Sequence, residues 1–460
     1  MYKVDFNKPC NVYFMGIGGI SMSGLAEILL QENFTVSGSD IKESDITETL
    51  KACGATINIG QVAENITDDI DLVVYTAAIS KDNEEFLEVQ RRNIPLLTRA
   101  QLLGQIMSNY KYGIAISGTH GKTTTTSMMS HVLLSADTDP TISIGGMLDV
   151  IGGNIRVGKS DYFVTEACEY TNSYHSFNPY ISIILNVDED HLDFFSGIDE
   201  IVQSFKTFAE ILPQDGLLVI NGDMEHKDTI ISDLNCKILT FGLEAGNDYS
   251  ATDISFDEEG HPTYTLLVNG TPSDRITLHA TGIHNVINSL SVIAVCDFLD
   301  IERSAVIAGL LACTSAKRRF EHKGITKNGV IVVDDYAHHP TEISATLTAA
   351  KNTPHNELYV VFQPHTYTRT YALLDKFAEA LKDCDHVILA DIYAAREKDN
   401  GMVSAKDLEI KINNLGGHAI HIGDFLSIEK FIEKNCKKND LLITMGAGNV
   451  DFIGDSLLKK

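Results

Sequence analysis

The fold is decided by residues 112–134, YGIAISGTHGKTTTTSMMSHVLL, which read as a buried strand, a glycine-rich loop and a helix. Backbone N–H groups of such a loop can surround a polyphosphate, while a lysine neutralises its terminal oxygens and a threonine hydroxyl binds Mg²⁺. The full pattern has another glycine five residues before Gly121, where this chain has Ile116. We expect Lys122 to be exposed and to supply charge rather than packing. The predicted nucleoside triphosphate site is formed by Gly118, Thr119, His120, Gly121, Lys122, Thr123 and Thr124.

Apolar, β-branched or aromatic runs alternate with helical stretches over most of the chain. Strands too apolar to have a solvated face predict parallel sheets covered by helices, which is the α/β class. The runs lie at 11–15, 34–40, 71–77, 112–118, 162–167, 181–187, 330–336, 358–363, 386–392 and 441–448.

The length of 460 residues predicts three domains at roughly 150 residues each. A new strand and glycine loop begin near residues 109–112, and a polar, basic stretch at 315–329 separates a helical segment from the next strand. Turn signals within residues 216–280 predict a small antiparallel part of the mostly parallel central sheet. We expect a Rossmann-like domain at 1–109, a P-loop ATPase-like domain at 110–316 and a Rossmann-like α/β domain at 317–460.

Composition excludes several classes of protein. With 36 Lys and Arg against 63 Asp and Glu, the net charge is −27, which argues against nucleic acid as a partner. No apolar run approaches the roughly 20 residues of a membrane span, and the first residues do not resemble a signal peptide. We therefore expect a cytoplasmic protein without membrane insertion. The eight cysteines are scattered, without the spacing of a zinc site or disulfide framework.

A second glycine loop follows the first strand, in NVYFMGIGGISMSGLAEILL. Its glycines would let the backbone approach a phosphate at a helix N-terminus, although Ser21 stands where a third glycine is usual. The next strand ends at an aspartate that could reach a ribose hydroxyl. Either a dinucleotide or a UDP-sugar would suit this site. The candidate residues are Gly16, Gly18, Gly19, Ser39 and Asp40.

Acidic residues follow two further predicted strands. Glu166 ends one strand, and DEDHLD (188–193) follows another. Ligands collect at the carboxyl ends of strands in such sheets, so both groups can reach the phosphate loop. Carboxylates suit Mg²⁺, and a neutral imidazole can join a second ion. For any one residue of DEDHLD, a solvated loop acid is an equally good interpretation.

Later loops carry residues typical of binding sites. His284, Asn285 and Asn288 lie near the start of a helix, where an amide could contact a base edge or only cap the helix. Arg318 and Arg319 could reach a phosphate from the second joint. DDYAHHP and QPHTYTRT follow two strands, and they predict a second face of one cleft. Their candidate residues are Asp335, Tyr336, His338, His339, His365 and Arg369.

A set of motifs occurs in order along residues 10–450: GIGGISMSGLA, SGSD, SGTHGKTTTT, EACEY, NVDEDHLDFF, TGIHNVINSL, RRFE, DDYAHHPTE, QPHTYTRT and MGAGNV. Together they resemble the Mur ligases of peptidoglycan synthesis. The GTHGKTTT loop alone marks the wider ligase family, which includes folylpolyglutamate synthases. GIGGI, DDYAHHPTE and QPHTYTRT point to the alanine-adding branch of the Mur ligases.

The resemblance implies a UDP-binding first domain, an ATP-binding central domain and a third domain that completes the site. It departs from the family at Thr366, where many relatives have arginine, and at Glu169, where ADESD is common. The implied roles are Lys122 and Arg319 on phosphates, Thr123 and Glu166 on Mg²⁺, His191 on a second metal ion, Asn285 near adenine, Asp335 near ribose, and Tyr336, His338 and Arg369 facing the amino acid.

The implied reaction is ATP-dependent amide formation. The lactyl carboxylate of UDP-N-acetylmuramate would form an acyl phosphate, which L-alanine would then attack, with His338 a candidate proton acceptor. Three alternatives stay open: a recycling ligase that attaches a whole peptide, a nicotinamide-dependent oxidoreductase, and a nucleotide-switched binding protein. The sequence is compatible with a monomer or a homodimer.

Overall fold

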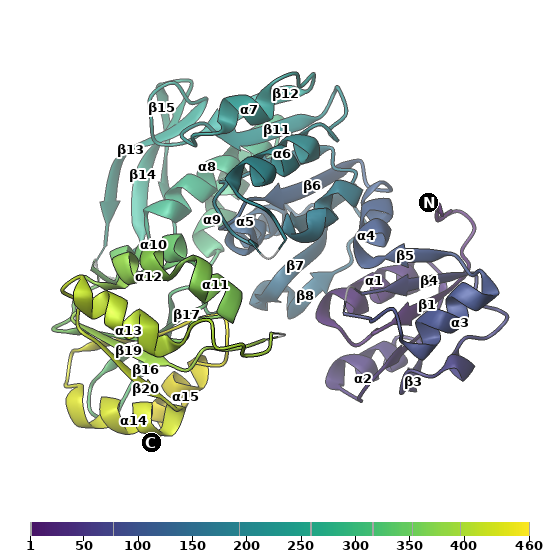
Figure 1. Cartoon of the computed structure of the whole chain (residues 1–460). Helices are drawn as coiled ribbons and strands as arrows, with labels where there is room; N and C mark the ends of the chain where they lie inside the picture. Colours follow the sequence, from purple (N-terminus) through teal and green to yellow (C-terminus); the bar gives the residue numbers. More distant parts are fainter. Residues whose placement is uncertain are drawn as a thin grey trace.

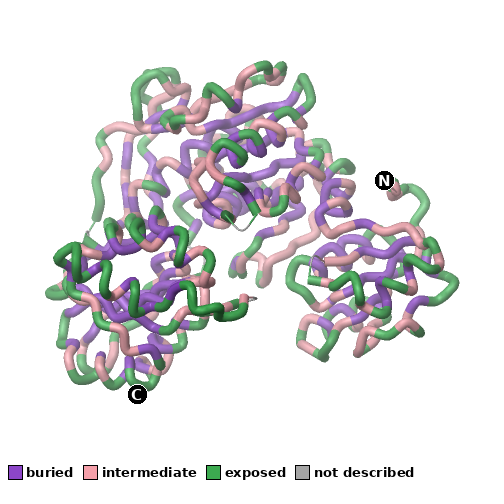
Figure 2. The backbone as a smooth tube through the Cα atoms, viewed as in Figure 1, coloured by how far each residue is buried: buried purple, intermediate pink, exposed green. Residues whose placement is uncertain are grey.

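The computed structural model describes residues 2–76, 78–192, 194–257, 260–314, 317–351, 353–395 and 397–459. Three α/β domains follow one another along the chain, each built on its own sheet (Figure 1). The most buried residues follow the strands of each domain (Figure 2). The predicted α/β class with mostly parallel sheets is confirmed. No helix among the described residues is both long and apolar enough to span a membrane.

The first domain has a five-stranded parallel sheet in the order β3-β2-β1-β4-β5. This is a Rossmann order, and its ligand crevice lies where the strand order reverses, beside β1. The strands are β1 (Asn11–Met15), β2 (Thr35–Asp40), β3 (Thr56–Ile59), β4 (Leu72–Tyr75) and β5 (Leu96–Thr98). The helices are α1 (Ile20–Gln31), α2 (Asp45–Ala52), α3 (Glu84–Arg92) and α4 (Arg99–Met107).

The central domain has a ten-stranded sheet in the order β15-β14-β13-β12-β11-β10-β6-β9-β7-β8. The strands are β6 (Tyr112–Ser117), β7 (Thr141–Leu148), β8 (Gly153–Arg156), β9 (Tyr162–Ala167), β10 (Ile181–Ile184), β11 (Leu217–Asn221), β12 (Lys237–Phe241), β13 (Tyr249–Phe256), β14 (Pro262–Val268) and β15 (Thr271–Thr277). The helices are α5 (Lys122–Ser135), α6 (Ile198–Ala209), α7 (Lys227–Ile231), α8 (Ile283–Phe298) and α9 (Arg303–Ala312). Because β9 and β10 flank β6, their following loops meet beside the phosphate loop.

The antiparallel part of this sheet is smaller than residues 216–280 predicted. β11 and β12 are parallel strands, so the antiparallel addition begins only with β13 and comprises β13, β14 and β15. A second antiparallel pair, β7 with β8, closes the other edge of the sheet. The turn residues indicated where the chain reverses, but they could not indicate which strands pair in parallel.

The third domain has a six-stranded sheet in the order β16-β17-β21-β18-β19-β20. The basic joint at 315–329 contains β16, an edge strand antiparallel to β17 that the polar sequence concealed. The strands are β16 (Glu321–Ile325), β17 (Ile331–Asp335), β18 (Leu358–Phe362), β19 (His386–Ala390), β20 (Ala419–Gly423) and β21 (Leu441–Met445). The helices are α10 (Pro340–Lys351), α11 (Tyr367–Ala372), α12 (Leu374–Leu381), α13 (Ala405–Asn414), α14 (Phe425–Asn435) and α15 (Asp451–Lys459).

The helix after the phosphate loop, α5, is fixed by close packing against α9. Gly309 is buried, and a Cβ atom there would lie 2.4 Å from the backbone Cα of Val132 in α5. Such a contact is too short to be relieved by a side-chain rotation. The missing side chain at Gly309 therefore sets the distance between the two helices and, with it, the position of the loop that precedes α5.

We predict that Gly309→Ala destabilises the protein by about 1–3 kcal/mol, because an added methyl group must push α9 away from α5. Ala308→Ser, on the exposed side of the same helix, is the control and should change stability by less than about 0.5 kcal/mol. Calorimetric unfolding measures both effects. Equal transition temperatures for the two variants would contradict this role of Gly309.

Candidate active site

The phosphate loop joins β6 to α5 as predicted, and its backbone conformation depends on glycine. Gly121 has φ +85° and immediately precedes α5, in the left-handed region that favours glycine. Asn186, after β10, holds the loop through two hydrogen bonds between its side-chain amide and the backbone of His120. Its Oδ1 accepts a hydrogen bond from the N–H of His120 at 2.8 Å, and its Nδ2 donates to the carbonyl of the same residue at 3.0 Å.

Lys122 is more buried than we expected, and that prediction is wrong. Its side chain is 15% exposed, and Nζ lies 3.0 Å from a carboxylate oxygen of Glu169, which is itself 3% exposed. Nζ also donates to the carbonyls of Gly118 and Thr119. Burial by itself would lower the pKa of Lys122, but the Glu169 carboxylate raises it overall. Lys122 is thus held as a cation inside the loop.

Thr123 and Glu166 lie together at the start of α5 and the end of β9. The Thr123 hydroxyl donates to Glu166 Oε2 at 3.1 Å, and Glu166 Oε1 accepts from the N–H of Gly145 at 2.6 Å. A hydroxyl oxygen and a carboxylate oxygen are the ligands that Mg²⁺ prefers. The pair therefore fits a magnesium ion beside the phosphate loop.

His191 lies near Glu169, the carboxylate that pairs with Lys122. Its Nε2 is 3.7 Å from Glu169 Oε1 and 3.9 Å from Asp190 Oδ2, and its ring packs on Tyr170 at 4.6 Å between centroids. The predicted second-metal residue is thus brought near Glu169, which sequence comparison had left uncertain. Of the other acidic residues predicted here, Asp193 lies outside the described residues.

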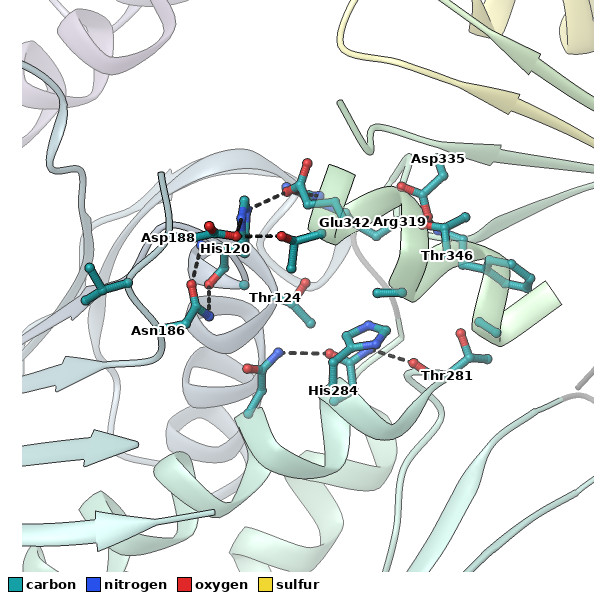
Figure 3. Close-up of a pocket in the computed structure, with 18 residues that line it drawn as sticks. His120, Thr124, Asn186, Asp188, Thr281, His284, Arg319, Asp335, Glu342 and Thr346 are labelled. Carbon is teal, nitrogen blue, oxygen red and sulfur yellow. Dashed lines mark hydrogen bonds and ion pairs between the residues drawn. The ribbon is translucent and has the colours of Figure 1, made fainter. Parts of the chain in front are cut away.

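A cavity of about 280 Å³ lies between the central and third domains. Figure 3 shows His120, Thr124 and Asp188 of the central domain across from Arg319, Asp335 and Glu342 of the third domain. The α8 residues His284, Asn285 and Asn288 also line it. The structure therefore brings the phosphate loop, the predicted base-binding residues and the predicted ribose-binding residue to one space.

Several of these polar groups already have partners within the protein. Asn285 donates to the carbonyl of Thr281 at 2.8 Å and accepts from Asn288 at 3.1 Å. Both carboxylate oxygens of Asp335 accept backbone hydrogen bonds, from Phe320 at 2.9 Å and Ala337 at 2.8 Å. Burial raises the pKa of Asp335 to about 6. These two residues thus also shape the cavity wall.

Arg319 enters the cavity from the joint before β16. Its guanidinium lies 3.4 Å from Glu342 and 5.5 Å from the centre of the Tyr336 ring. Burial by itself would lower the pKa of Arg319, but the carboxylates of Glu342 and Asp335 raise it overall. The neighbouring Arg318 instead binds Asp334 at 2.8 Å and the carbonyls of Gly446 and Gly448. Arg319 is therefore the arginine of this pair that faces the cavity.

His338 is held as a neutral imidazole. Burial lowers its pKa to about 4, against the opposing effect of Glu342. Nδ1 lies 3.0 Å from the carbonyl of Tyr336, which can only accept, so Nδ1 carries the proton. In this tautomer Nε2 carries a lone pair. The geometry thus leaves a basic nitrogen on a side chain that stays uncharged at neutral pH.

Arg369 spans the two domains through an ion pair. Its Nε and Nη2 donate to Asp190 Oδ1 at 3.1 and 2.9 Å, and Nη1 lies 3.1 Å from Nδ1 of His365. Burial by itself would raise the pKa of Asp190, but Arg369 lowers it overall. A second cavity beside this pair is lined by Tyr170, Glu189, Asp190, His191, Leu192, His365, Thr366, Thr368, Arg369, Ala372, Leu373, Ala395 and Glu397.

Tyr336 is not among the residues that line either cavity. Its ring packs against Arg318 and Arg319 and also against the ring of His338, which contacts His365 beside Arg369. Thr366, at the position where relatives often have arginine, accepts from the N–H of Arg369 and so caps α11.

The first-domain residues meet at the turn after β1. Gly16 has φ +78°, and Asp40 Oδ2 accepts from the N–H of Gly18 at 2.9 Å. The carbonyl of Ser39 accepts from the N–H of Gly16, while its buried hydroxyl donates to Glu85 at 2.7 Å. Ser39 therefore shapes the glycine turn and directs its side chain into the domain.

Sequence reasoning did not single out Asn186 and Glu342. Asn186 lies two residues before the acidic run, inside the strand-end motif NVDEDHLDFF. Glu342 lies four residues after His338, in the first turn of α10, inside DDYAHHPTE. Its carboxylate lies near His120, Arg319 and His338, which together hold its pKa well below the usual range despite burial. The four-residue spacing of His338 and Glu342 in the sequence could have indicated that these two side chains lie close together.

The fold and this cavity define a three-domain α/β protein with a P-loop-like glycine loop at a cavity between its central and third domains. Comparison with family models then identifies the group to which it belongs. Residues 11–111 match "Mur ligase family, catalytic domain", residues 116–296 match "Mur ligase middle domain", and residues 318–448 match "Mur ligase, glutamate ligase domain". The chain belongs to the Mur ligase family.

Similar proteins match along the whole chain. A UDP-N-acetylmuramate–L-alanine ligase of Lachnospira eligens is 56% identical over 460 residues, covering 100% of both chains. The crystal structure of the UDP-N-acetylmuramate-alanine ligase of Thermotoga maritima has a TM-score of 0.79 at 28% identity, covering 98% of each chain. A murein peptide ligase of Psychrobacter arcticus has a TM-score of 0.68 at 24% identity, also covering 98% of each, which shows the shared fold.

The lowered pKa of His338 predicts a pH dependence of stability. Below its unfolded pKa of 6.5 this histidine binds a proton in the unfolded state but not in the folded state. The free energy of unfolding is therefore highest above pH 6.5, and it decreases as pH falls toward the folded pKa of about 4. Over these 2.5 pKa units the loss is at most about 3.5 kcal/mol, at about 1.4 kcal/mol per unit. We predict that His338→Gln, which cannot titrate, loses less stability than the wild type between pH 6.5 and 4.5. Parallel pH profiles of unfolding would contradict a buried neutral His338.

Proposed function

We propose that this protein is an ATP-dependent ligase that joins L-alanine to the lactyl carboxylate of UDP-N-acetylmuramate. The products are UDP-N-acetylmuramoyl-L-alanine, ADP and phosphate, in peptidoglycan synthesis. The observation that carries the proposal is one cavity with the phosphate loop on its central-domain wall and Arg319 on its third-domain wall. The full-length similarity to the Lachnospira eligens ligase supports the choice of substrates.

Each of the three domains, at residues 1–109, 110–316 and 317–460, has its own role in the proposed reaction. The first binds the UDP part at the Gly16–Asp40 turn, the second binds ATP, and the third completes the site. The reaction runs in the cytoplasm, where ATP is available. The protein would act as a monomer or a homodimer.

In the first step, a lactyl carboxylate oxygen attacks the γ-phosphorus of ATP, and ADP leaves. Positioning and charge neutralisation dominate the catalysis of phosphoryl transfer. Lys122 supplies a buried cation at the loop, and Arg319 supplies a second cation from the facing domain. For Lys122 to reach the phosphates, its ammonium must exchange the carbonyls of its own loop for phosphate oxygens. The product is an acyl phosphate.

In the second step, the neutral amine of L-alanine attacks the acyl carbon, and the tetrahedral intermediate expels phosphate. The amine must lose one proton on the way to the amide. We assign His338 Nε2 as its acceptor, because this imidazole is neutral and carries the lone pair on that atom. The docked third domain excludes water, which otherwise would hydrolyse the acyl phosphate.

One or two magnesium ions would bind beside the loop. Thr123 and Glu166 would hold one, and His191 with Glu169 would contribute to a second. Bound Mg²⁺ supplies positive charge that neutralises phosphate oxygens in the transition state. Glu169 would then balance both the second ion and Lys122, which gives a physical reason for a carboxylate at this position.

The amino-acid carboxylate requires a cation with two donors, and Arg369 offers a planar fork of this kind. It lines the second cavity beside His365 and His191, close to the phosphate loop. Its present partner, Asp190, accepts from Nε and Nη2, and Nη1 faces His365, so the alanine carboxylate would bind the remaining N–H donors of Nη1 and Nη2. Tyr336 lines neither cavity, and its ring packs against His338, Arg318 and Arg319.

A phosphate-release assay tests the reaction. Phosphate should appear only when UDP-N-acetylmuramate, ATP and L-alanine are all present. Faster release with a tripeptide than with free L-alanine would instead indicate the recycling ligase, whose fold is shared by the murein peptide ligase. Release without a carboxylate acceptor would indicate a nucleotide switch, and NAD binding would indicate an oxidoreductase.

We predict that removing the Lys122 charge lowers turnover by at least about 100-fold, as loss of one preorganised donor does in other enzymes. Lys122→Met alone leaves Glu169 buried and unpaired, so Lys122→Met/Glu169→Gln keeps the site neutral. Lys406→Ala, on an exposed helix position, is the control. Near-normal turnover in a folded double variant would contradict the role of Lys122.

We predict that Arg369→Ala raises KM for L-alanine about 10- to 100-fold, as expected for the loss of a charged hydrogen bond. KM for ATP should change much less. Asp190→Asn breaks the same interdomain contact but keeps the guanidinium, so it separates binding of alanine from bracing of the domain. Equal effects of the two variants on KM for L-alanine, or loss of ATP affinity alone in Arg369→Ala, would contradict the assignment.

A further inference from the structure

A second cluster of ligand-type side chains lies at the interface of the central and third domains. Among the described residues, His120, Asp188 and His339 each offer one ligand atom, and these atoms lie within 4.8 Å of one another. His120 Nε2 is 3.5 Å and His339 Nδ1 is 3.8 Å from Asp188 Oδ2. Ligands at zinc–nitrogen bond lengths around one tetrahedral zinc lie about 3.3 Å apart. The atoms are thus nearly at the spacing of one coordination sphere.

In both imidazoles, the ring nitrogen that points away from Asp188 faces an oxygen acceptor. His120 Nδ1 lies 3.5 Å from Glu342 Oε1, and His339 Nε2 lies 3.0 Å from the carbonyl of Glu189. A carbonyl can only accept, so His339 Nε2 carries a proton, and the lone pair of Nδ1 accepts from the N–H of Thr341 at 3.3 Å, beside Asp188. Histidines that bind metals usually donate their other N–H to a carboxylate or carbonyl in this way. Both imidazoles therefore have the outer contacts of metal ligands. Zinc at His339 Nδ1 would replace the hydrogen bond from Thr341, and zinc at His120 would displace a proton, because Asp188 and Glu342 raise the pKa of His120 to about 9 against the opposing effect of burial.

One atom of the cluster lacks a hydrogen-bond partner. His120 Nε2 is buried and has no hydrogen bond, although it points toward Asp188. Asp188 Oδ2 is also oriented, since it accepts from the Thr341 hydroxyl. The ligase steps use the backbone of His120 in the phosphate loop and assign no task to its imidazole or to that of His339. The pair of imidazoles is thus unexplained by the proposed reaction.

We propose that His120, Asp188 and His339 form a binding site for zinc that links the central domain to the third domain. Two nitrogens and one carboxylate oxygen suit zinc, whereas Mg²⁺ prefers oxygen ligands alone. Asp188 and His120 also line the interdomain cavity, which provides a route of entry. Because the ligands come from both domains, bound zinc holds the third domain in its docked position.

The site differs from the magnesium sites of the proposed function. Those use Thr123, Glu166, Glu169 and His191, none of which belongs to this cluster. Zinc binding can therefore be measured in the absence of nucleotide and magnesium, separately from any assay of ligase activity. Failure of one proposal leaves the other intact.

Equilibrium dialysis of the full chain against buffered zinc, together with cobalt(II) absorption, tests the site. We expect one zinc equivalent per chain, and a visible spectrum typical of tetrahedral cobalt when Co²⁺ replaces it. His339→Ala should weaken zinc binding by at least about tenfold. His339→Gln is the second variant, because its amide can still donate to the carbonyl of Glu189 and so preserves the fold.

The control is His191→Ala, which removes the histidine nearest the proposed magnesium site. It should keep the zinc equivalent and the cobalt spectrum. Loss of zinc in His191→Ala, with binding retained in both His339 variants, would place the ion at the phosphate loop and overturn the proposal. Absence of a zinc equivalent in the wild type would also overturn it.

Discussion

The third domain is held on the central domain by three consecutive acidic residues after β10. The nucleotide cavity depends on these contacts because its two walls belong to different domains. The Glu189–Lys376 pair is largely exposed and contributes about 1 kcal/mol at most, whereas Asp190 and Arg369 are mostly buried. The three contacts pair Asp188 with Thr341, Glu189 with Lys376, and Asp190 with Arg369. An acidic loop that could have been a solvated surface is instead an interdomain joint.

The cavity between the two domains also contains buried charged side chains. Lys122, Arg319 and the carboxylates of Glu169 and Glu342 are all withdrawn from water, so each must be paired inside the protein. In this structure the ammonium of Lys122 contacts the carbonyls of Gly118 and Thr119 and the carboxylate of Glu169, where the proposed reaction would place phosphate oxygens. Binding of ATP would then exchange partners rather than bury new charges, which keeps the site organised for phosphoryl transfer.

The strands and the phosphate loop could be predicted from sequence because both depend on local pattern. Apolar runs gave the parallel strands, and GTHGKTT gave the loop between β6 and α5. Contacts between domains could not be predicted, because no local pattern shows that Asp190 meets Arg369 or that Glu342 meets His120. The same limit explains Lys122: its spacing indicated a phosphate ligand, but its burial depends on Glu169, 47 residues later. The polar edge strand β16 was missed because it lacks an apolar run.

The measurement that tests the account most directly follows the oxygen atoms of the lactyl carboxylate. If this cleft forms an acyl phosphate, UDP-N-acetylmuramate labelled with ¹⁸O in that carboxylate transfers one labelled oxygen to each phosphate released when L-alanine is present. Mass spectrometry of the phosphate detects the transfer. Unlabelled phosphate would show that water attacks ATP instead, and it would contradict a ligase that works through an acyl phosphate.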